Sequence, residues 1–380
     1  RKTKEIISAN FQRSPIFSGQ IQSTGPRYCP SIEAKYHRFA DKERHQIFLE
    51  PEGRTTDWVY PNGLSTSMPA DVQLEFLRSI KGLENVEIIR PGYAVEYDFV
   101  LPTQLYPTLE TKLVSGLYTA GQINGSSGYE EAAAQGLMAG ANAALKILGR
   151  PPLVFERFEA YIGVLIDDLV TKGTEEPYRL FTSRAEYRLL LREDNVENRL
   201  RGRAYEAGLI DEKTLQAYNE RRLLIEKTIE WLSNTKISPS AKTVQLVEEA
   251  SLGELKKQLT LKEILRRPHA SLKSIHLVAP APEELALKKL TKEQIFAIET
   301  EVKYEGYITR QLEEVRRSKQ TEKMKIPEAL EYGKVPGLST EVREKLMRVR
   351  PLSIGQAGRI PGITPAAITM LMVYLKSISR

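Results

Sequence analysis

Two patterns of hydrophobic and polar positions divide the chain. Residues 16–150 carry short runs rich in β-branched and aromatic residues, interrupted by turns, as in HQIFLE, DWVYPNGLST and VEIIRPGYAVEYDFVLP. From Phe155 onward, apolar residues recur three and four positions apart among charged ones, as in KTLQAYNERRLLIEKTIEWL. We therefore predict strands in the first part and amphipathic helices in the second.

Proline and glycine mark the expected boundaries. Pro151 and Pro152 separate the two patterns, and a second break falls near Pro327. In the last segment, Thr364 and Pro365 predict the N-cap and first residue of a helix that is apolar on most sides and must be buried. We predict four regions: a β-rich part at 1–97, a strand, loop and helix part at 98–150, a helical domain at 151–325 and a small helical subdomain at 326–380.

One loop stands out between these elements. Residues 121–140 read GQINGSSGYEEAAAQGLMAG, after a predicted buried strand from Leu117 to Ala120, and the next helix is expected to begin near Ser127. Small residues let backbone N–H groups approach a ligand, and a helix N-terminus favours negative charge. Gly136 and Gly140 would keep the helix thin enough to press against a sheet or a cofactor. Close packing without any ligand explains the same composition, and the residues alone leave both readings open.

Composition limits the classes of protein. At 380 residues and 41% hydrophobic, the chain is long enough for two or three packed domains. Its apolar runs are shorter than the ~20 residues that span a bilayer, and the first thirty residues lack the apolar core of a signal peptide, so we expect a cytoplasmic protein with no membrane segment. One cysteine and four histidines argue against a disulfide framework and a structural metal site.

Charge is unevenly distributed. Residues 1–150 hold 16 basic and 16 acidic side chains, whereas residues 151–380 hold 39 and 33. This excess favours a nucleic-acid partner, although a solvated helical surface of mixed charge fits equally well. In the stretch EPYRLFTSRAEYRLLLREDN, arginines alternate with aromatic residues, a composition that suits contact with RNA. The same arginines could instead pair with neighbouring carboxylates and fix the orientation of the domain. The candidate tRNA-binding residues are Arg184, Arg188, Arg192, Arg316 and Arg317.

The cysteine has polar, cationic neighbours. Cys29 follows Arg27 and Tyr28 and precedes Lys35 by six residues. Nearby cations favour the thiolate, which could attack C6 of a uracil, whereas the alternative is a buried, inert cysteine. Tyr93, in the stretch RPGYAVEYD, could stack on a flat ring or simply pack.

Two of these stretches resemble family signatures. AGQINGSSGYEEAAAQGLMAGANA is similar to the second signature of the MnmG (GidA) family, and GPRYCPSIEAKYHRF is similar to its first. The resemblance extends over nearly all of the chain. It implies an FAD-dependent enzyme that acts as a homodimer with the GTPase MnmE. That enzyme adds an aminomethyl or carboxymethylaminomethyl group to C5 of the wobble uridine (position 34) of tRNA, with methylene-tetrahydrofolate as one-carbon donor and NADH as reductant.

The resemblance also implies a fold and a site. The fold is an α/β (α+β) FAD-binding Rossmann-like portion with a β-rich insertion, followed by an all-α domain whose C-terminal end docks MnmE. Cys29 would be catalytic, together with Arg27, Lys35 and Tyr93. Gln122 takes the place of an acid that bonds the ribityl chain in this class of flavin fold. The implied cofactor-binding residues are Gly121, Gln122, Asn124, Gly125, Ser126, Ser127, Gly128, Tyr129 and Glu130.

The chain departs from the family at its start. It has no GxGxxG fingerprint, and RKTKEIISANFQRSP is similar to an interior part of the family. We therefore expect a chain that lacks the N-terminal nucleotide-binding segment, retains little FAD and is inactive alone. Two other hypotheses are a folate- and FAD-dependent tRNA uridine methyltransferase, which lacks a long helical half, and a non-catalytic RNA- or protein-binding fragment.

Overall fold

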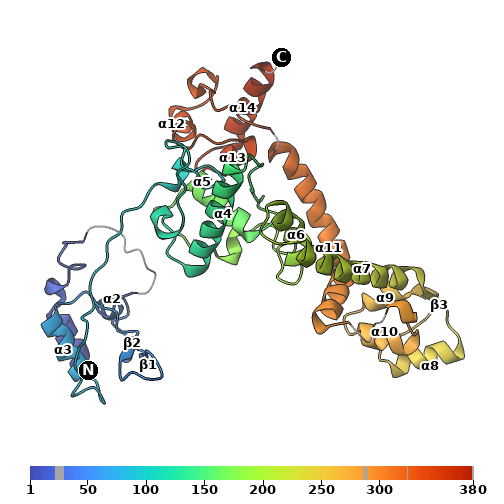
Figure 1. The fold of residues 1–380 in the computed structure, drawn as a ribbon, viewed down its shortest axis with the longest axis horizontal. Helices are drawn as coiled ribbons and strands as arrows, with labels where there is room; N and C mark the ends of the chain where they lie inside the picture. Colours follow the sequence, from blue (N-terminus) through green and yellow to red (C-terminus); the bar gives the residue numbers. More distant parts are fainter. Residues whose placement is uncertain (22–29, 286, 288–289, 323, 379–380) are drawn as a thin grey trace. The chain divides into compact units, whose positions relative to one another are not determined.

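The computed structural model describes residues 1–21, 30–285, 287, 290–322 and 324–378, and Figure 1 draws its ribbon. The chain forms two compact units, and each is described by itself. The first unit comprises Arg1–Leu101, Gly121–Ala132 and Thr174–Arg179. The second comprises Pro102–Ala120, Ala133–Gly173 and Leu180–Arg380.

The first unit is built from short helices around a small apolar core. Its helices are α1 (Lys2–Ala9), α2 (Ile32–Arg38) and α3 (Ala70–Arg78), and it contains the hairpin of β1 (Phe48–Pro51) and β2 (Val59–Asn62). The two strands pair antiparallel, with Phe48 opposite Asn62 and Pro51 opposite Val59. One buried cluster joins the three helices: Ile7, Ile32, Leu64, Met68, Val72 and Phe76.

The strand predictions hold only in part. The runs HQIFLE and DWVYPNGLST contain β1 and β2, as expected. Residues 86–101 form no strand, and at 117–120 the predicted strand is wrong, because only an isolated bridge joins Tyr118 to Glu110. Thr119 donates its N–H to Leu109 and Thr111 donates to Leu117, so this segment closes a short irregular turn. A strand needs a continuous partner, and residues 105–111 supply single bridges instead of a ladder.

The second unit is almost entirely helical, as the 3.6-residue periodicity predicts. Its helices are α4 (Tyr129–Ile147, beginning in the first unit), α5 (Tyr161–Lys172), α6 (Val196–Glu206), α7 (Glu212–Asn234), α8 (Ala241–Glu249), α9 (Leu261–Leu265), α10 (Leu272–Val278), α11 (Lys292–Glu322), α12 (Thr340–Val349), α13 (Ile354–Arg359) and α14 (Pro365–Ile378). A two-residue pairing of β3 (Lys236–Ile237) with β4 (Leu259–Thr260) is its one sheet among the described residues. Short 3₁₀ helices across the chain are Phe11–Arg13, Pro102–Gln104, Gly121–Asn124, Thr182–Arg184, Glu283–Leu285 and Tyr332–Lys334.

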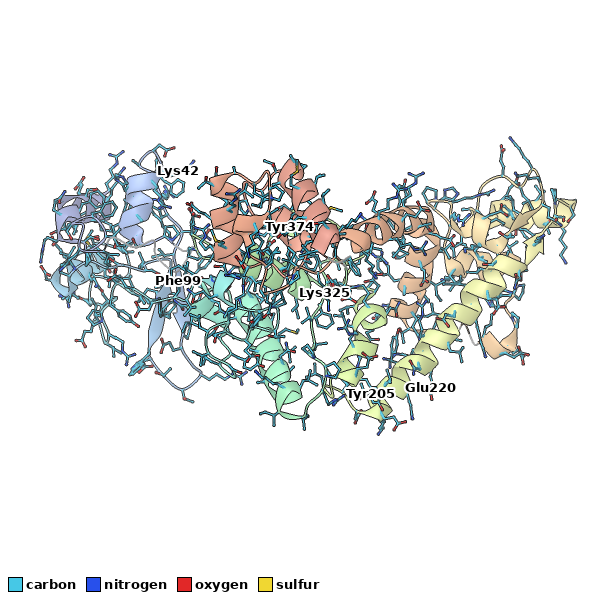
Figure 2. All side chains as sticks on the ribbon, turned by 90° about the horizontal axis from the view of Figure 1, so that it is seen from above. Lys42, Phe99, Tyr205, Glu220, Lys325 and Tyr374 are labelled. Carbon is cyan, nitrogen blue, oxygen red and sulfur yellow. The ribbon has the colours of Figure 1, made fainter. Side chains whose placement is uncertain are left out.

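Most of the helical part is held together by two of its apolar clusters. The larger cluster joins α7, α9, α10 and α11, and its fully buried members include Leu232, Leu261, Ile264, Ile275 and Ile298. Side-chain hydroxyls cap several of these helices, since Ser240 and Thr260 each form a reciprocal capping box. Figure 2 shows the side chains of this region, with Tyr205 on α6 and Glu220 on α7 labelled.

The C-terminal helices α12, α13 and α14 enclose the second cluster. Thr364 caps α14 through its hydroxyl, which accepts the N–H of Ala367 at 3.2 Å, and the helix begins at Pro365, as the sequence predicts. The expected burial of α14 holds for one face of the helix. Leu371 is fully buried, but Val373 is 61% exposed, because the neighbouring helices cover one face only.

The structure is largely helical with small sheets and ends in a helical part, which is consistent with the predicted fold class of an α/β portion with a β-rich insertion followed by an all-α domain. None of the helices in the described ranges is both long and apolar enough to cross a bilayer.

Candidate functional site

The glycine loop of the first unit has an unusual backbone. Gly121 and Gly125 both have positive φ values, of 79° and 73°, and the residues between them form a single 3₁₀ turn. Ser126 donates its N–H to the Gly121 carbonyl at 3.1 Å, and α4 begins at Tyr129. Glycine at these two positions allows the left-handed conformations that reverse the chain.

The loop leaves buried polar atoms without partners. Ser126 is completely buried, and its hydroxyl has no hydrogen-bond partner among the described residues. The side-chain amide nitrogen of Gln122 is also buried and has no hydrogen-bond partner among the described residues. An unsatisfied buried donor costs about 1–3 kcal/mol, so two in one turn favour a group that accepts from them. These donors fit the polar edge of a flavin ring, which carries carbonyl oxygens and ring nitrogens.

The other loop residues lie in varied environments. Asn124 and Gly128 are buried, and Gly125 and Ser127 are half-buried. Tyr129 is 90% exposed, and Glu130 is also exposed. Most of the predicted cofactor residues thus lie in the loop that precedes α4, whereas Tyr129 and Glu130 form the first turn of the helix itself.

A distant segment seals the loop. Tyr178 donates its N–H to the Gly125 carbonyl at 2.7 Å, and Arg179 lies 3.6 Å from the carboxylate of Glu131. A Cβ on Gly128 would stand 2.6 Å from the Arg179 guanidinium, so the segment packs closely. The carboxylate of Glu131 places negative charge at the start of α4 and opposes the positive end of the helix dipole. The hydrogen-bond donors of the loop therefore suit an electron-rich ligand better than the helix N-terminus does.

Sequence reasoning missed this packing. Residues 174–179 belong to the helical domain predicted at 151–325, and nothing in their spacing indicates that they pack on the loop. Gly136 and Gly140, expected to press against a sheet or a cofactor, contact no other element among the described residues, and the cofactor contact stays a prediction. A Cβ on either glycine would meet open space.

Two predicted catalytic residues, Arg27 and Cys29, lie outside the described residues. Lys35 lies on α2 and donates from Nζ to the Gly63 carbonyl at 2.9 Å. It therefore ties α2 to the turn that follows β2. Tyr93 is 71% exposed and lies in an irregular segment of the first unit.

A buried polar group on α2 was not predicted. Glu33 is fully buried, and its Oε1 accepts from the hydroxyl of Ser67 at 2.7 Å and from its N–H at 2.9 Å. Ser67 also lies 3.0 Å from the hydroxyl of Ser14. This trio fixes the helix that directly follows Cys29. A glutamate on the apolar face of α2 was the signal that could have revealed it.

The predicted RNA-binding arginines divide into two groups. Arg192 makes a bidentate pair with Asp194, at 2.9 and 3.0 Å, and Arg184 lies 3.8 Å from Asp168. Arg188, Arg316 and Arg317 are exposed, and no ion pair joins them to another described residue. Among the predicted set, these three present free guanidinium groups to a polyanion.

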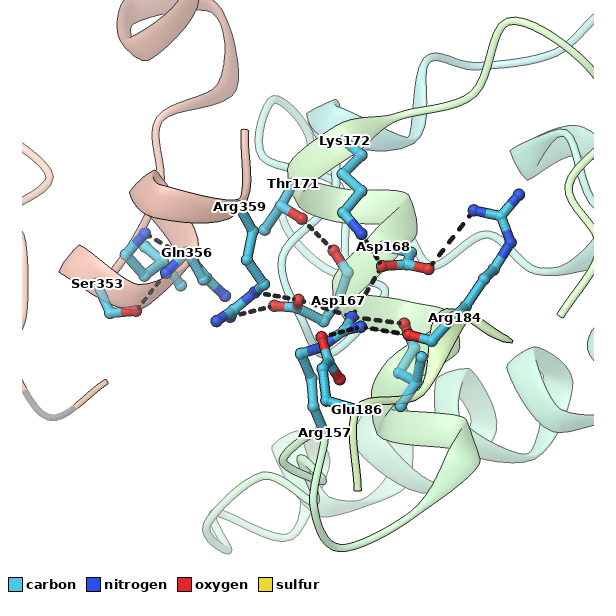
Figure 3. Close-up of polar contacts among 12 residues, drawn as sticks. Arg157, Asp167, Asp168, Thr171, Lys172, Arg184, Glu186, Ser353, Gln356 and Arg359 are labelled. Atoms are coloured by element: carbon cyan, nitrogen blue, oxygen red, sulfur yellow. Dashed lines mark hydrogen bonds and ion pairs between the residues drawn. The ribbon is translucent and has the colours of Figure 1, made fainter. Parts of the chain in front are cut away.

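A charge network surrounds the buried side chains of Arg157 and Asp168 in the second unit (Figure 3). The Arg157 guanidinium donates to Asp168 at 2.8 Å, to Asp167 at 3.2 Å and to Glu186 at 2.8 Å. Arg359 of α13 makes a bidentate pair with Asp167, at 2.6 and 2.8 Å. The network therefore joins α5 to the C-terminal helices, and Arg184 contributes its carbonyl to Arg157 at 2.9 Å.

The network shifts the ionisation of its buried acid. Burial alone would raise the pKa of Asp168, but the hydrogen bond from Lys172 and the charge of Arg157 outweigh it, so the pKa lies below the ordinary 3.8. A depressed carboxyl pKa contributes stability that is fully present above the unfolded-state value. That stability is lost as the pH falls through the lower folded-state pKa.

Among the described residues, no three His, Cys, Asp or Glu side chains are grouped closely enough to hold a metal ion.

Comparison with known proteins places these features in a family. Residues 1–151 match the family model "Glucose inhibited division protein A". Residues 212–312 match the "tRNA modifying enzyme MnmG/GidA C-terminal helical domain", and residues 314–380 match its "C-terminal helical bundle". The chain belongs to the MnmG/GidA family.

Individual relatives are similar over almost the whole chain. The tRNA uridine 5-carboxymethylaminomethyl modification enzyme MnmG of Thermodesulfovibrio yellowstonii is 56% identical over 375 residues, which are 99% of this chain and 59% of the relative. The MnmG of Geobacillus kaustophilus is 54% identical, with the same coverage. This member of the family thus spans about three fifths of the length of the curated relatives that it matches.

Solved structures agree with this assignment. GidA of Aquifex aeolicus in its form I crystal has a TM-score of 0.77 and 47% identity, covering 98% of this chain and 58% of that chain. The form II crystal gives the same TM-score at 46% identity, covering 98% of this chain and 57% of that chain. The helical second part is therefore a GidA-like fold, as predicted.

Proposed function

We propose that the chain forms the tRNA-handling part, and a portion of the flavin site, of an enzyme that modifies the wobble uridine of tRNA. The product is an aminomethyl or carboxymethylaminomethyl group at C5 of uridine 34. The observation that carries this proposal is the identity of 54% to 56%, over 99% of the chain, to relatives named tRNA uridine 5-carboxymethylaminomethyl modification enzyme.

The loop at 121–128 is our candidate for the flavin-facing surface. FAD would supply the redox chemistry, with NADH as reductant and methylene-tetrahydrofolate as one-carbon donor. The hydroxyl of Ser126 and the amide of Gln122 would donate to the polar edge of the ring and stabilise the negative charge of its reduced form. Asn124, Tyr129 and Glu130 would complete the site together with the backbone of Gly121, Gly125, Ser127 and Gly128.

The thiol segment is our candidate for uridine chemistry. The Cys29 thiolate would attack C6 of the uracil, which makes C5 nucleophilic toward the one-carbon unit, and expulsion of the thiol after loss of the C5 proton restores the ring. Arg27 would favour the thiolate. Lys35 would also contribute positive charge that favours the thiolate. Its amine donates to the Gly63 carbonyl, so this charge would be held in a fixed position on α2. The exposed ring of Tyr93 is available to stack on a uracil or a pterin.

Partners follow from the second unit. Arg188, Arg316 and Arg317 are proposed to contact tRNA phosphates, and the paired Arg184 and Arg192 would hold the surface that carries Arg188. The exposed apolar side of α14 supports docking of the GTPase MnmE. We further propose a homodimer that works in the cytoplasm. The matches at 212–380 argue against the folate-dependent uridine methyltransferase, whose fold lacks this helical half.

Flavin binding and tRNA binding test the proposal together. The full-length protein that contains this chain is purified, incubated with excess FAD, passed through a desalting column and examined for the visible absorption of bound flavin, and NADH is then added to bleach that band. In parallel, tRNA binding is measured by filter retention over a series of salt concentrations. We expect bound flavin, NADH-dependent bleaching and salt-sensitive tRNA binding. A colourless protein that also fails to retain tRNA at low salt would exclude the enzyme.

Cysteine substitution tests the thiol. In the full-length protein that contains this chain, Cys29→Ser should abolish formation of the modified wobble nucleoside in tRNA digests while leaving the thermal midpoint and tRNA binding unchanged. Ser31→Ala is a suitable comparison for stability, because the Ser31 hydroxyl caps α2 and its loss should cost about 1 kcal/mol. Modified uridine formed at the normal rate by Cys29→Ser would remove the nucleophile from the proposal.

A further inference from the structure

A cavity of about 340 Å³ lies within the second unit, between residues 103–113 and the C-terminal helices. Its volume is in the range of small-molecule sites. Three cations and one carboxylate line it, so its charge is positive, and tyrosine and proline side chains form much of the remaining wall. The lining residues that matter here are Tyr106, Lys112, Glu328, Tyr332, Arg348 and Arg350.

Lys112 joins the two sides of the cavity. Its Nζ donates to the Thr103 carbonyl at 2.8 Å and to the Val349 carbonyl at 2.7 Å. An ammonium group has three N–H donors, so one is left for a ligand. The amine also lies 6.0 Å from the centre of the Tyr106 ring. The cation is therefore held in place before any ligand arrives.

Arg350 occupies a backbone position that favours glycine. It ends α12 in the left-handed conformation, with φ 52° and ψ 60°, and its N–H reaches the Leu346 carbonyl. Glycine adopts this conformation without the steric cost that an L-residue bears. Unlike glycine, arginine has a side chain here that lines the cavity. Its guanidinium donates one N–H to the Glu328 carbonyl at 3.0 Å.

We propose that this cavity binds a nucleoside phosphate, with the phosphate held by Arg348, Arg350 and Lys112 and the nucleoside against Tyr106. Arginine forks match phosphate oxygens in pairs, and a lysine adds a compact charge. Phosphate alone would leave most of the volume empty, whereas an aromatic wall suits a base. The cavity is lined by residues of the second unit alone, and the proposed site does not depend on the proposed enzyme activity.

The protonation of Lys112 gives this site a pH dependence. Burial and the charge of Arg350 lower the pKa of Lys112 to about 8, and Glu328 opposes them in part. Arg348 is the other charged group on this wall. Burial raises the pKa of the Tyr332 phenol to about 12, so the phenol stays neutral over this pH range. A bound phosphate favours the ammonium form. Affinity should therefore fall as the pH rises from 7 to 9, above the second phosphate pKa of about 6.

Calorimetric titration of the 380-residue chain tests the proposal, with AMP, adenosine and inorganic phosphate as probes. We expect one AMP site, with phosphate and adenosine each at least tenfold weaker. Arg350→Gly and Arg348→Gln should each weaken AMP by about tenfold or more, the loss expected for charge-assisted hydrogen bonds. Arg350→Gly should keep its fold, because glycine suits that backbone, and an unchanged thermal midpoint verifies this.

Lys334→Gln is the matched control, since it removes one exposed charge from the same subdomain without lining the cavity, and AMP affinity should not change. Equal affinities for AMP and inorganic phosphate would overturn the nucleoside part. Absence of AMP binding at millimolar concentration, or binding unaltered in Arg350→Gly and Arg348→Gln, would overturn the site. Competition by a short RNA hairpin, sensitive to Arg350→Gly, would assign the phosphate to RNA, and its failure to compete would assign a free nucleotide.

Discussion

Two buried polar clusters in this chain are made of similar groups and differ in how their hydrogen bonds are satisfied. Around Arg157, in the second unit, the guanidinium is matched by Asp167, Asp168 and Glu186, and further donors reach the same carboxylates. In the glycine loop of the first unit, Ser126 is just as deeply buried, but its hydroxyl has no partner among the described residues.

The comparison separates a structural cluster from a ligand site. A network whose donors and acceptors are all used has nothing left to offer a substrate, and its loss affects folding. A turn whose buried donors lack hydrogen-bond partners destabilises the folded chain, and a ligand that accepts from those donors removes this destabilisation. The density of charged groups alone would indicate the Arg157 cluster as the functional site. The presence of buried donors without partners indicates the loop instead.

The largest effect should come from breaking the satisfied cluster. Arg157→Met leaves Asp168, which is 1% exposed, with a much weaker set of counter-charges, and the free energy of unfolding should fall by about 3–5 kcal/mol. Urea denaturation measures this change. Arg188→Met removes an exposed arginine and should stay within about 0.5 kcal/mol. A loss below 1 kcal/mol in Arg157→Met would show that the network contributes little to stability.

A smaller loss should follow from crowding the backbone beside that cluster. A Cβ on Gly163 would lie 2.4 Å from the Glu156 carbonyl and 2.6 Å from the Phe155 carbonyl, so Gly163→Ala must displace the segment that carries Arg157. We expect a loss of about 1–3 kcal/mol in urea denaturation. Gly136→Ala faces open space within a helix and should gain up to about 1 kcal/mol. If both substitutions behaved alike, helix propensity alone would account for them.

A pair of buried serines tests the loop directly. Ser126→Ala removes an unpartnered hydroxyl, so the free energy of unfolding should stay the same or rise by up to about 1 kcal/mol, while retention of FAD by the full-length protein that contains this chain falls several-fold. Ser67→Ala removes a hydroxyl that donates to Glu33 and should cost about 1–3 kcal/mol without an effect on FAD. Thermal unfolding and flavin titration provide the two readouts. A destabilised Ser126→Ala would mean that the hydroxyl is satisfied within the chain.

The smallest effect on folding belongs to the exposed arginines of α11. Charge reversal at Arg316 and Arg317 should leave the thermal midpoint unchanged, because neither side chain pairs with another described residue. It should weaken tRNA binding and reduce the slope of log affinity against log salt by roughly 0.9 for each phosphate that the protein no longer neutralises. Filter binding at several salt concentrations measures that slope. An unaltered slope would return both arginines to an ordinary solvated surface.

The pattern of residues predicted local structure well where the signal is local. Periodicity located the helical second half, and Thr364 with Pro365 predicted the start of α14, because capping and the fixed φ of proline act within one turn. Glycines 121 and 125 marked a loop with a helix after it, because only glycine adopts positive φ at low cost. The family resemblance, carried by the same loop and by the cysteine segment, agreed with the matches to known proteins.

Pairings between distant residues were decided only in the tertiary structure. Arg359 and Asp167 pair across 192 positions, and Tyr178, from the helical domain predicted at 151–325, donates its N–H to Gly125 in the loop. The predicted strand at 117–120 became a turn, because a strand exists only when a continuous partner lies beside it. Whether an arginine is paired or free, and whether a buried hydroxyl is satisfied, depends on which distant atoms arrive next to it, and residue spacing does not encode that.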